Sequence, residues 1–240
     1  MAIEQKANLA DRGWVTTLAS PSDPTAPVVA PIGLTDLGPV AQLRAGRMAR
    51  RLPQLVVGLV LYGVSLAMMV RGDLGLAPWD VLHSGLIRHV PITLGQAVVV
   101  MSFVVLVAWV PLREVPGIGT ISNALVVGFS ADATLAVLGE PSALMLRGGL
   151  MVGGVLLCGL ASAMYIGAQL GRGPRDGLMT GLHRRTGLSI RLVRTLLEVA
   201  VVLVGLLLGG VAGLGTVLYA LAIGPLTQRW LPRWIVPLER

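Results

Sequence analysis

The sequence predicts an all-α polytopic membrane protein in which six transmembrane helices form two inverted three-helix repeats. Three observations predict this fold: an apolar composition, apolar stretches of membrane-spanning length, and an internal repeat. Hydrophobic residues make up 54% of the 240 residues and charged residues only 13%, whereas soluble domains average about 25% charged residues. The 31 glycines suit helices that pack closely in lipid.

The apolar stretches approach or reach the length of about 20 residues that a helix needs to cross a bilayer. At the start of the second stretch, Thr93 and Gln96 form a capping-box pattern. Between the last two stretches only Gly209 and Gly210 indicate a turn, and the internal repeat favours two spans there over one long helix. The six predicted spans are residues 52–70, 94–110, 118–138, 150–170, 192–208 and 211–226.

The distribution of basic residues predicts the orientation, because Lys and Arg accumulate in cytoplasmic loops. With the N-terminus inside, six spans leave only Arg71, Arg88 and Arg147 of the 19 Lys and Arg residues outside. We therefore expect both termini in the cytoplasm. The net charge of +7 comes from these basic ends of apolar stretches. No nucleic-acid-binding motif accompanies it, so a nucleic acid partner is not expected.

The internal repeat is found by comparing each residue with the one 96 positions later, without gaps. Each copy has three spans, an odd number, so the second copy enters the membrane from the opposite side. Inverted repeats of this kind are typical of secondary transporters, in which the substrate path lies at the repeat interface. The clearest matches pair Gly75, Pro78, Asp80, Gly85 and Arg88 with Gly171, Pro174, Asp176, Gly181 and Arg184.

The repeat divides the chain into three parts. Residues 44–140 form the first three-helix repeat, and residues 141–240 form the second repeat with a short C-terminal tail. Residues 1–43 are polar and contain five prolines, so we predict a disordered cytoplasmic tail.

Each copy carries the pattern Gly-x-x-Pro-x-Asp directly after its first span, at residues 75–80 and 171–176. Glycine can end a helix in the left-handed conformation, and proline fits the first turn of the next helix. Aspartate in that first turn faces the positive end of the helix dipole. We expect a broken helix in each copy, made of a span, a sharp turn and a short helix.

Two interpretations of these motifs stay open. Asp80 and Asp176 can stabilise short interfacial helices through the helix dipole. Alternatively, the motifs form a substrate or ion path, with Asp80 towards the outside and Asp176 towards the inside, each able to bind a cation or carry a proton. The candidate path residues are Gly75, Pro78, Asp80, Gly171, Pro174, Asp176 and, within the fifth span, Glu198.

Other polar residues allow further interpretations. An intramembrane carboxylate such as Glu198 is functional by default, but it can equally pair with Arg194 or Arg191 on its own helix. Its counterpart in the first copy is Ser102, and Asn123 and its counterpart Tyr219 are expected to hydrogen-bond between helices. An anionic ligand or lipid head group is also a candidate near the second motif. The candidate contacts are Arg172, Arg175, Arg184 and Arg185.

No metal site or cofactor is expected from the remaining residues. His83, His89 and His183 lack ligand spacing within one helix. Cys158 is the single cysteine of the chain, so we expect it to be a small core residue.

The two motifs also carry a family resemblance. The segments Gly75-Leu-Ala-Pro78-Trp79-Asp80-Val and Gly171-Arg-Gly-Pro174-Arg175-Asp176-Gly-Leu-Met-Thr180-Gly181 resemble the YczE-like membrane proteins of the YczE/YyaS/YitT grouping. The resemblance covers residues 50–230. It implies a multi-pass protein of the bacterial cytoplasmic membrane and supplies neither a substrate nor catalytic residues.

We predict a small secondary transporter or permease-like protein of unknown substrate. The lipid bilayer is its expected environment, a small solute or ion its candidate cargo, and a homodimer a candidate assembly. The alternative is a non-transporting membrane accessory protein that supports the assembly or export of a partner. An enzyme is not expected, because no clustered set of catalytic side chains is recognisable.

Overall fold

The computed structural model describes Leu34 and residues 37–238. The described helices all belong to the unit Thr35–Arg240. Most of the predicted N-terminal tail lies outside the described residues, while residues 37–43 lead into and contribute to the short helix α2. The helices are α2 (Pro39–Arg44), α3 (Met48–Gly72), α4 (Pro78–Leu86), α5 (Leu94–Leu112), α6 (Ile118–Val137), α7 (Leu144–Gly167), α8 (Pro174–Thr186), α9 (Ile190–Leu207) and α10 (Leu214–Trp234).

Helices α7 to α10 begin at the same 96-residue offset from α3 to α6 that relates the two halves of the sequence. The paired first residues are Met48 and Leu144, Pro78 and Pro174, Leu94 and Ile190, and Ile118 and Leu214. The first copy is therefore a long helix, a short helix and two further helices, and the second copy has the same order. The turn expected between the last two predicted spans lies between Leu207 and Leu214.

The helix starts predicted at Thr93, Pro78 and Pro174 are confirmed, whereas α3, α7, α9 and α10 begin two to six residues away from the predicted span starts. The Thr93 hydroxyl accepts a hydrogen bond from the Gln96 N–H, and the Gln96 side chain accepts one from the Thr93 N–H, which completes the capping box. Pro78 and Pro174 are the first residues of α4 and α8, where the missing N–H costs nothing. Gly75 and Gly171 have φ angles of +113° and +128°, which favour glycine. The broken helix is thus present in both copies.

Helices α3 and α7 form the centre of the unit and run antiparallel. Gly58 packs against residues 161–165 of α7, and its counterpart Gly154 packs against residues 65–69 of α3. A Cβ atom at either position would lie 2.9–3.0 Å from backbone atoms of the other helix or the base of a side chain, so glycine permits this close approach. Helix α6 packs on α3 and α10 packs on α7. Cys158 is fully buried in this core, as predicted.

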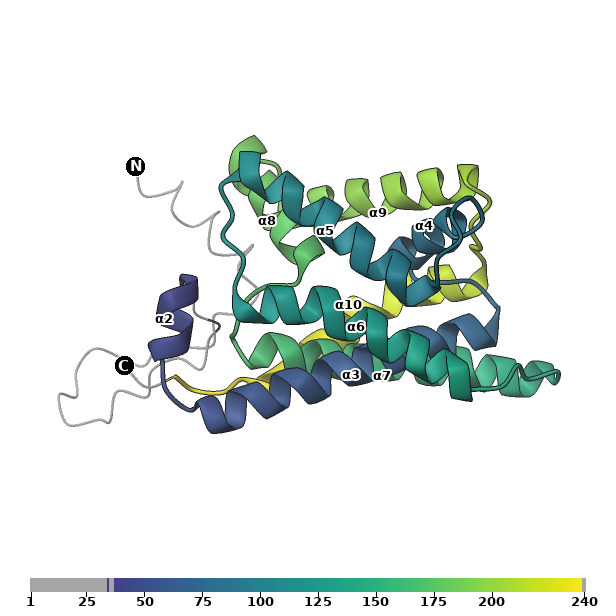
Figure 1. Cartoon of the computed structure of the whole chain (residues 1–240), viewed down its shortest axis with the longest axis horizontal. Helices are drawn as coiled ribbons and strands as arrows, with labels where there is room; N and C mark the ends of the chain where they lie inside the picture. Colours follow the sequence, from purple (N-terminus) through teal and green to yellow (C-terminus); the bar gives the residue numbers. More distant parts are fainter. Residues whose placement is uncertain (1–33, 35–36, 239–240) are drawn as a thin grey trace, which may run out of the picture. The chain divides into compact units, whose positions relative to one another are not determined.

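The remaining helices pack across the two copies. Short helix α4 lies against α9, and short helix α8 lies against α5. In the view of Figure 1, these four helices lie on one side of the α3–α7 pair. The turns before the short helices are also held by the opposite copy. The Gly215 N–H donates to the Leu74 carbonyl, and the Gly119 N–H donates to the Leu170 carbonyl, both at 2.7 Å.

Two arginines at equivalent positions hold the ends of the central pair. Arg51 donates from Nε to the Ala168 carbonyl at 2.9 Å and from Nη2 to the Gln169 carbonyl at 2.7 Å. Arg147 donates from Nε to the Gly72 carbonyl and from Nη2 to the Asp73 carbonyl, at 3.1 and 2.7 Å. Each guanidinium therefore satisfies carbonyls at the C-terminal end of the other long helix, where intrahelical donors are lacking.

Four of the described helices have the length and composition of membrane spans. Helices α3, α5, α6 and α7 are long and apolar enough to cross a membrane. Many large apolar side chains on their outer faces are exposed, as expected for contact with lipid rather than water. Helices α9 and α10, also predicted as spans, are not among these four helices. Helix α9 carries Arg191, Arg194 and Glu198, and the end of α10 contains Thr227, Gln228 and Arg229.

Candidate functional site

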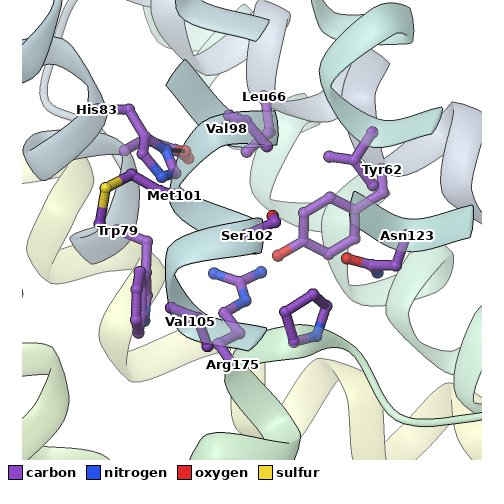
Figure 2. Close-up of a pocket in the computed structure, with 13 residues that line it drawn as sticks. Tyr62, Leu66, Trp79, His83, Val98, Met101, Ser102, Val105, Asn123 and Arg175 are labelled. Atoms are coloured by element: carbon purple, nitrogen blue, oxygen red, sulfur yellow. Dashed lines mark hydrogen bonds and ion pairs between the residues drawn. The ribbon is translucent and has the colours of Figure 1, made fainter. Parts of the chain in front are cut away.

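A cavity lies between α3, α4, α5, α6 and α8, and both repeated motifs contribute to its lining. Its free volume is about 40 Å³, which is room for about three water molecules. Figure 2 shows polar and aromatic side chains from several helices around this space. The polar and aromatic lining residues are Tyr62, Trp79, Asp80, His83, Ser102, Asn123 and Arg175, and the apolar walls are Leu66, Val98, Met101, Val105, Val127 and Pro174.

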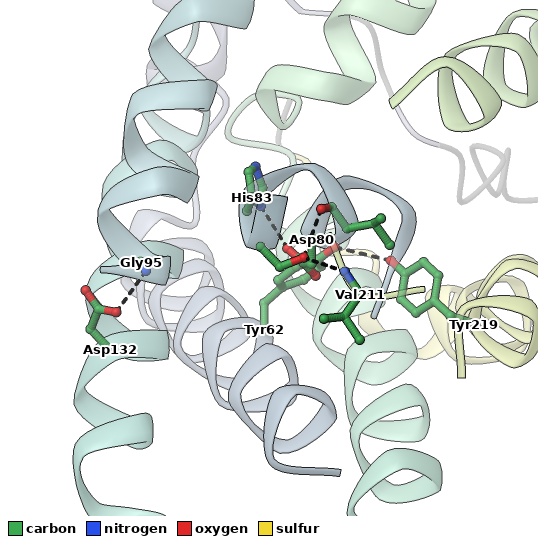
Figure 3. Close-up of polar contacts among 9 residues, drawn as sticks. Tyr62, Asp80, His83, Gly95, Asp132, Val211 and Tyr219 are labelled. Carbon is green, nitrogen blue, oxygen red and sulfur yellow. Dashed lines mark hydrogen bonds and ion pairs between the residues drawn. The ribbon is translucent and has the colours of Figure 1, made fainter. Parts of the chain in front are cut away.

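The first motif supplies a buried carboxylate–imidazole pair. Asp80 lies in the first turn of α4, and His83 follows one turn later on the same face. The His83 Nδ1 atom is 2.9 Å from the Asp80 Oδ1 atom, and both side chains are less than a tenth exposed. Figure 3 shows the pair. On the same helix, the Ser84 hydroxyl accepts the Val211 N–H at 3.1 Å. The pair can hold a proton or a cation inside the apolar unit.

The second motif supplies a guanidinium. Arg175 is the second residue of α8, and its guanidinium carbon lies 5.3 Å from the centre of the Tyr62 ring, within cation–π range. The start of α8 is fixed by Trp109, whose Nε1–H donates to the Pro174 carbonyl at 2.8 Å. The Trp109 ring lies over Gly177 so closely that a Cβ atom there would overlap it. The position of Arg175 therefore depends on α5 of the first copy.

The two aspartates of the repeat have different surroundings. Asp80 lines the cavity. Asp176 accepts a hydrogen bond from the Tyr165 hydroxyl at 2.5 Å, and its backbone carbonyl accepts one from the Thr180 hydroxyl. Asp176 lies beside the cavity residue Arg175 but is not itself part of the lining. The duplicated sequence thus gives one aspartate that faces the cavity and one held by tyrosine.

The other predicted site residues lie elsewhere. Glu198 accepts a hydrogen bond from Arg194 at 2.8 Å within α9, which is the helix pairing that the spacing allowed. The four arginines near the second motif also differ in place, since only Arg175 lines the cavity. Arg172 donates to the Thr180 hydroxyl, Arg184 pairs with Glu114, and Arg185 donates to the Pro111 carbonyl.

Sequence reasoning missed five polar or aromatic residues of the lining as site residues: Tyr62, Trp79, His83, Ser102 and Asn123. A signal existed for His83, because a residue three positions after Asp80 shares its helix face. Asn123 was expected to hydrogen-bond between helices, but no such bond forms among the described residues. Instead its amide lines the cavity. Within residues 37–238, no cluster of three or more His, Cys, Asp or Glu side chains is placed to hold a metal ion.

A helical unit with four helices of membrane-spanning length and composition is typical of a helical membrane protein. The chain belongs to the family described as a family of unknown function, DUF6198, which matches residues 49–232 and so includes both copies. The predicted resemblance to YczE-like proteins is confirmed. The chain is 31% identical over 182 residues to the uncharacterized membrane protein YczE of Bacillus subtilis, covering 74% of this chain and 84% of YczE.

Two further relatives support the same family. The chain is 40% identical over 177 residues to an uncharacterized protein of Haemophilus influenzae, covering 74% of this chain and 81% of that protein. It is 25% identical over 180 residues to the uncharacterized protein YyaS of Bacillus subtilis, covering 73% of this chain and 90% of YyaS. No solved structure matches the chain.

Proposed function

We propose that this protein is a small secondary transporter of the cytoplasmic membrane whose path passes through the cavity between the two motifs. One observation carries the proposal: α4 of the first copy and α8 of the second copy bring Asp80, His83 and Arg175 to a single cavity. Charged side chains inside an apolar helical protein are costly, and they commonly mark the pathway of a substrate or ion.

The proposed topology is six spans in two inverted repeats. The antiparallel run of the homologous helices α3 and α7 supports inversion, because equivalent helices of inverted copies cross the membrane in opposite directions. The exchange of contacts between the copies supports it as well, since α4 packs on α9 as α8 packs on α5. Helices α9 and α10 are the fifth and sixth spans, and both termini lie in the cytoplasm.

The proposed path works by alternating access. In transporters with inverted repeats, one repeat moves against the other around a site near the middle of the membrane. Here the site is the cavity, and the Asp80–His83 pair is the group that holds a proton or cation. The free volume of about 40 Å³ restricts the cargo in this conformation to a small solute or ion.

Uptake into proteoliposomes tests the proposal. Purified protein is reconstituted, and uptake of labelled small carboxylates, inorganic oxyanions, ammonium and monovalent cations is compared with uptake into protein-free liposomes. The expected result is protein-dependent uptake of at least one solute, reduced about tenfold or more by Asp80→Asn or Arg175→Gln, as expected for loss of a charge-assisted contact. Arg113→Gln removes an exposed arginine outside the cavity and leaves uptake unchanged.

The contradicting outcome is equally specific. If folded wild-type protein gives no uptake above protein-free liposomes with any solute of the panel, transport fails as the function. Stable co-purification with another membrane protein would then favour the accessory role.

A further inference from the structure

Arg175 brings hydrogen-bond donors and no acceptor to the cavity. Its guanidinium carries five N–H donors and lies over the face of the Tyr62 ring. A guanidinium that stacks on an aromatic ring keeps the N–H groups at its edge available for a planar partner. In Figure 2 the guanidinium of Arg175 points into the space between Trp79, Tyr62 and Ser102.

Two further donors face the same space. Ser102 on α5 and Asn123 on α6 line the cavity, and neither side chain has a hydrogen-bond partner within residues 37–238. Ser102, Asn123 and Arg175 are each partly exposed, and each can donate to a species bound in the cavity.

The Asp80 carboxylate already has one partner, since its Oδ1 atom is bonded to His83 at 2.9 Å. The Tyr62 hydroxyl lies 3.5 Å from the Tyr219 hydroxyl, and Figure 3 shows this contact on the α10 side. Because the guanidinium of Arg175 has donors and no acceptor, a species bound at its edge must bring acceptor atoms.

We infer that Arg175, Ser102 and Asn123 bind a small oxyanion, a monocarboxylate or an inorganic oxyanion of about three or four heavy atoms. The guanidinium fork matches two coplanar oxygens, and the hydroxyl and amide supply further donors. A free volume of about 40 Å³ leaves no room for a lipid acyl chain or a long side chain. The claim that this oxyanion is transported rests on the proposed function, but its binding to the site can be tested separately.

Asp80 is the charge that opposes this inference, because a carboxylate at the same cavity repels an anion. Its hydrogen bond to His83 offsets that repulsion, and Arg175 approaches from the opposite motif. The two charged residues are therefore expected to affect oxyanion binding differently. Removing the Arg175 charge weakens oxyanion binding, whereas removing the Asp80 charge does not.

Binding is measured by thermal unfolding of the purified protein, with a thiol-reactive dye that reports exposure of Cys158. This cysteine is the single one in the chain and is fully buried, so the dye reacts as the protein unfolds. The probes are sodium formate and sodium nitrate, with sodium gluconate at equal ionic strength as the bulky-anion control. A ligand that binds only the folded state raises the unfolding temperature in proportion to its saturation.

The expected result is that formate or nitrate raises the unfolding temperature and gluconate does not. In Arg175→Gln, the formate or nitrate concentration needed for the same rise in unfolding temperature is about 10- to 100-fold higher, as expected for loss of a charged hydrogen-bonding partner. Arg175→Lys, which keeps the charge without the fork, gives an intermediate value. Asp80→Asn binds at least as tightly as wild type, and Arg113→Gln binds equally. The unfolding temperature without ligand shows whether each variant is folded.

Three results would overturn the inference. These are no stabilisation by either probe, equal stabilisation in Arg175→Gln, or stabilisation that follows the sodium ion and is lost in Asp80→Asn. The last result would leave the transporter proposal intact with a cation as cargo. Conversely, Arg175-dependent formate binding without uptake in proteoliposomes would keep the oxyanion site and remove the transport function.

Discussion

The pair α5–α6 of the first copy and its equivalent α9–α10 of the second copy have different packing. Helices α5 and α6 pack together, whereas α9 and α10 make at most marginal contact among the described residues. Gly95 and Gly128 allow the close approach, since a Cβ atom on either one would overlap the backbone of the other. Asp132 then joins the helices by accepting the Gly95 N–H at 2.8 Å and the Thr93 hydroxyl at 2.5 Å.

The second copy lacks two of these residues at the equivalent positions. Arg191 replaces Gly95, and Gln228 replaces Asp132. Gly224 is retained as the counterpart of Gly128, but no atom lies within 4 Å of the position its Cβ would occupy. The apolar side chains of this region are left exposed, with Leu207 at 87% and Leu214 at 84%. A duplicated helix order therefore does not fix duplicated packing, because the residues at the contact differ between the copies.

The difference has a consequence for the proposed transport. Helix α9 packs on α4, which carries Asp80 and His83, and it is not tied to α10. Helix α5 is tied to α6 and also positions α8 through Trp109. Under the alternating-access proposal, we expect α4 and α9 to move as a pair against a framework that includes α5 and α6.

The largest expected effect comes from the contact of α5 with α8. Trp109→Ala removes a buried ring and the hydrogen bond to Pro174, with a cost of about 3–5 kcal/mol. At the equivalent contact, Gly205 of α9 faces Val81 and Leu82, so large and small residues are exchanged between the copies. Gly177→Val should therefore destabilise wild type but recover part of the loss in Trp109→Ala. A double-mutant cycle of unfolding free energies measures the coupling, and simple additivity would contradict this account.

A second prediction compares the two glycines on α6 and α10. Gly128→Leu places a side chain into the backbone of α5, and we expect a loss of about 3 kcal/mol because backbone atoms cannot give way. Gly224→Leu fills open space and gains up to about 1 kcal/mol from helix propensity. Thermal unfolding followed through Cys158 compares the variants. Equal losses at both positions would show that α10 is as closely packed as α6.

A third prediction concerns the two arginines that hold the central helices. Arg51 is fully buried and bonds carbonyl oxygens of Gln42, Ala168 and Gln169, so Arg51→Met leaves buried acceptors unsatisfied and costs about 2–3 kcal/mol. Arg147 is 29% exposed and also pairs with Asp73, so Arg147→Met costs less than about 1 kcal/mol because water replaces the lost donor. A lower unfolding temperature for Arg147→Met than for Arg51→Met would mean that the end of the α3–α7 pair that holds Arg51 is open to water.

The smallest expected effect is at Asp132. Asp132→Asn weakens the bonds to Thr93 and Gly95 and costs about 1 kcal/mol. Its counterpart Gln228 has no equivalent bond among the described residues, so Gln228→Asn stays within about 0.5 kcal/mol of wild type. Chemical unfolding in detergent can resolve the two variants. An effect at Gln228 as large as that at Asp132 would argue against the open α9–α10 pair.

The helix starts and the broken-helix motifs were predictable because capping residues, proline and glycine act locally. Thr93, Pro78 and Pro174 specify their own positions in a helix, whatever packs around them. The register of 96 residues also gave Ser102 as the counterpart of Glu198. Which of the two faces the cavity was not predictable, because inward-facing and lipid-facing residues are both apolar in a membrane helix and leave no clear periodicity. Contacts such as that of Arg175 with Tyr62 depend on how each helix is rotated about its own axis, and they appear only in the folded structure.

Side-specific labelling at the C-terminal ends of the two short helices tests the inverted arrangement most directly. His89 and Arg185 occupy equivalent positions and are both exposed, so His89→Cys and Arg185→Cys are introduced separately in a Cys158→Ser background. Intact cells are treated with a membrane-impermeant maleimide before and after permeabilisation. The account predicts that position 89 reacts in intact cells and position 185 only after permeabilisation. Reaction of both positions from the same side would show that the two copies are not inverted.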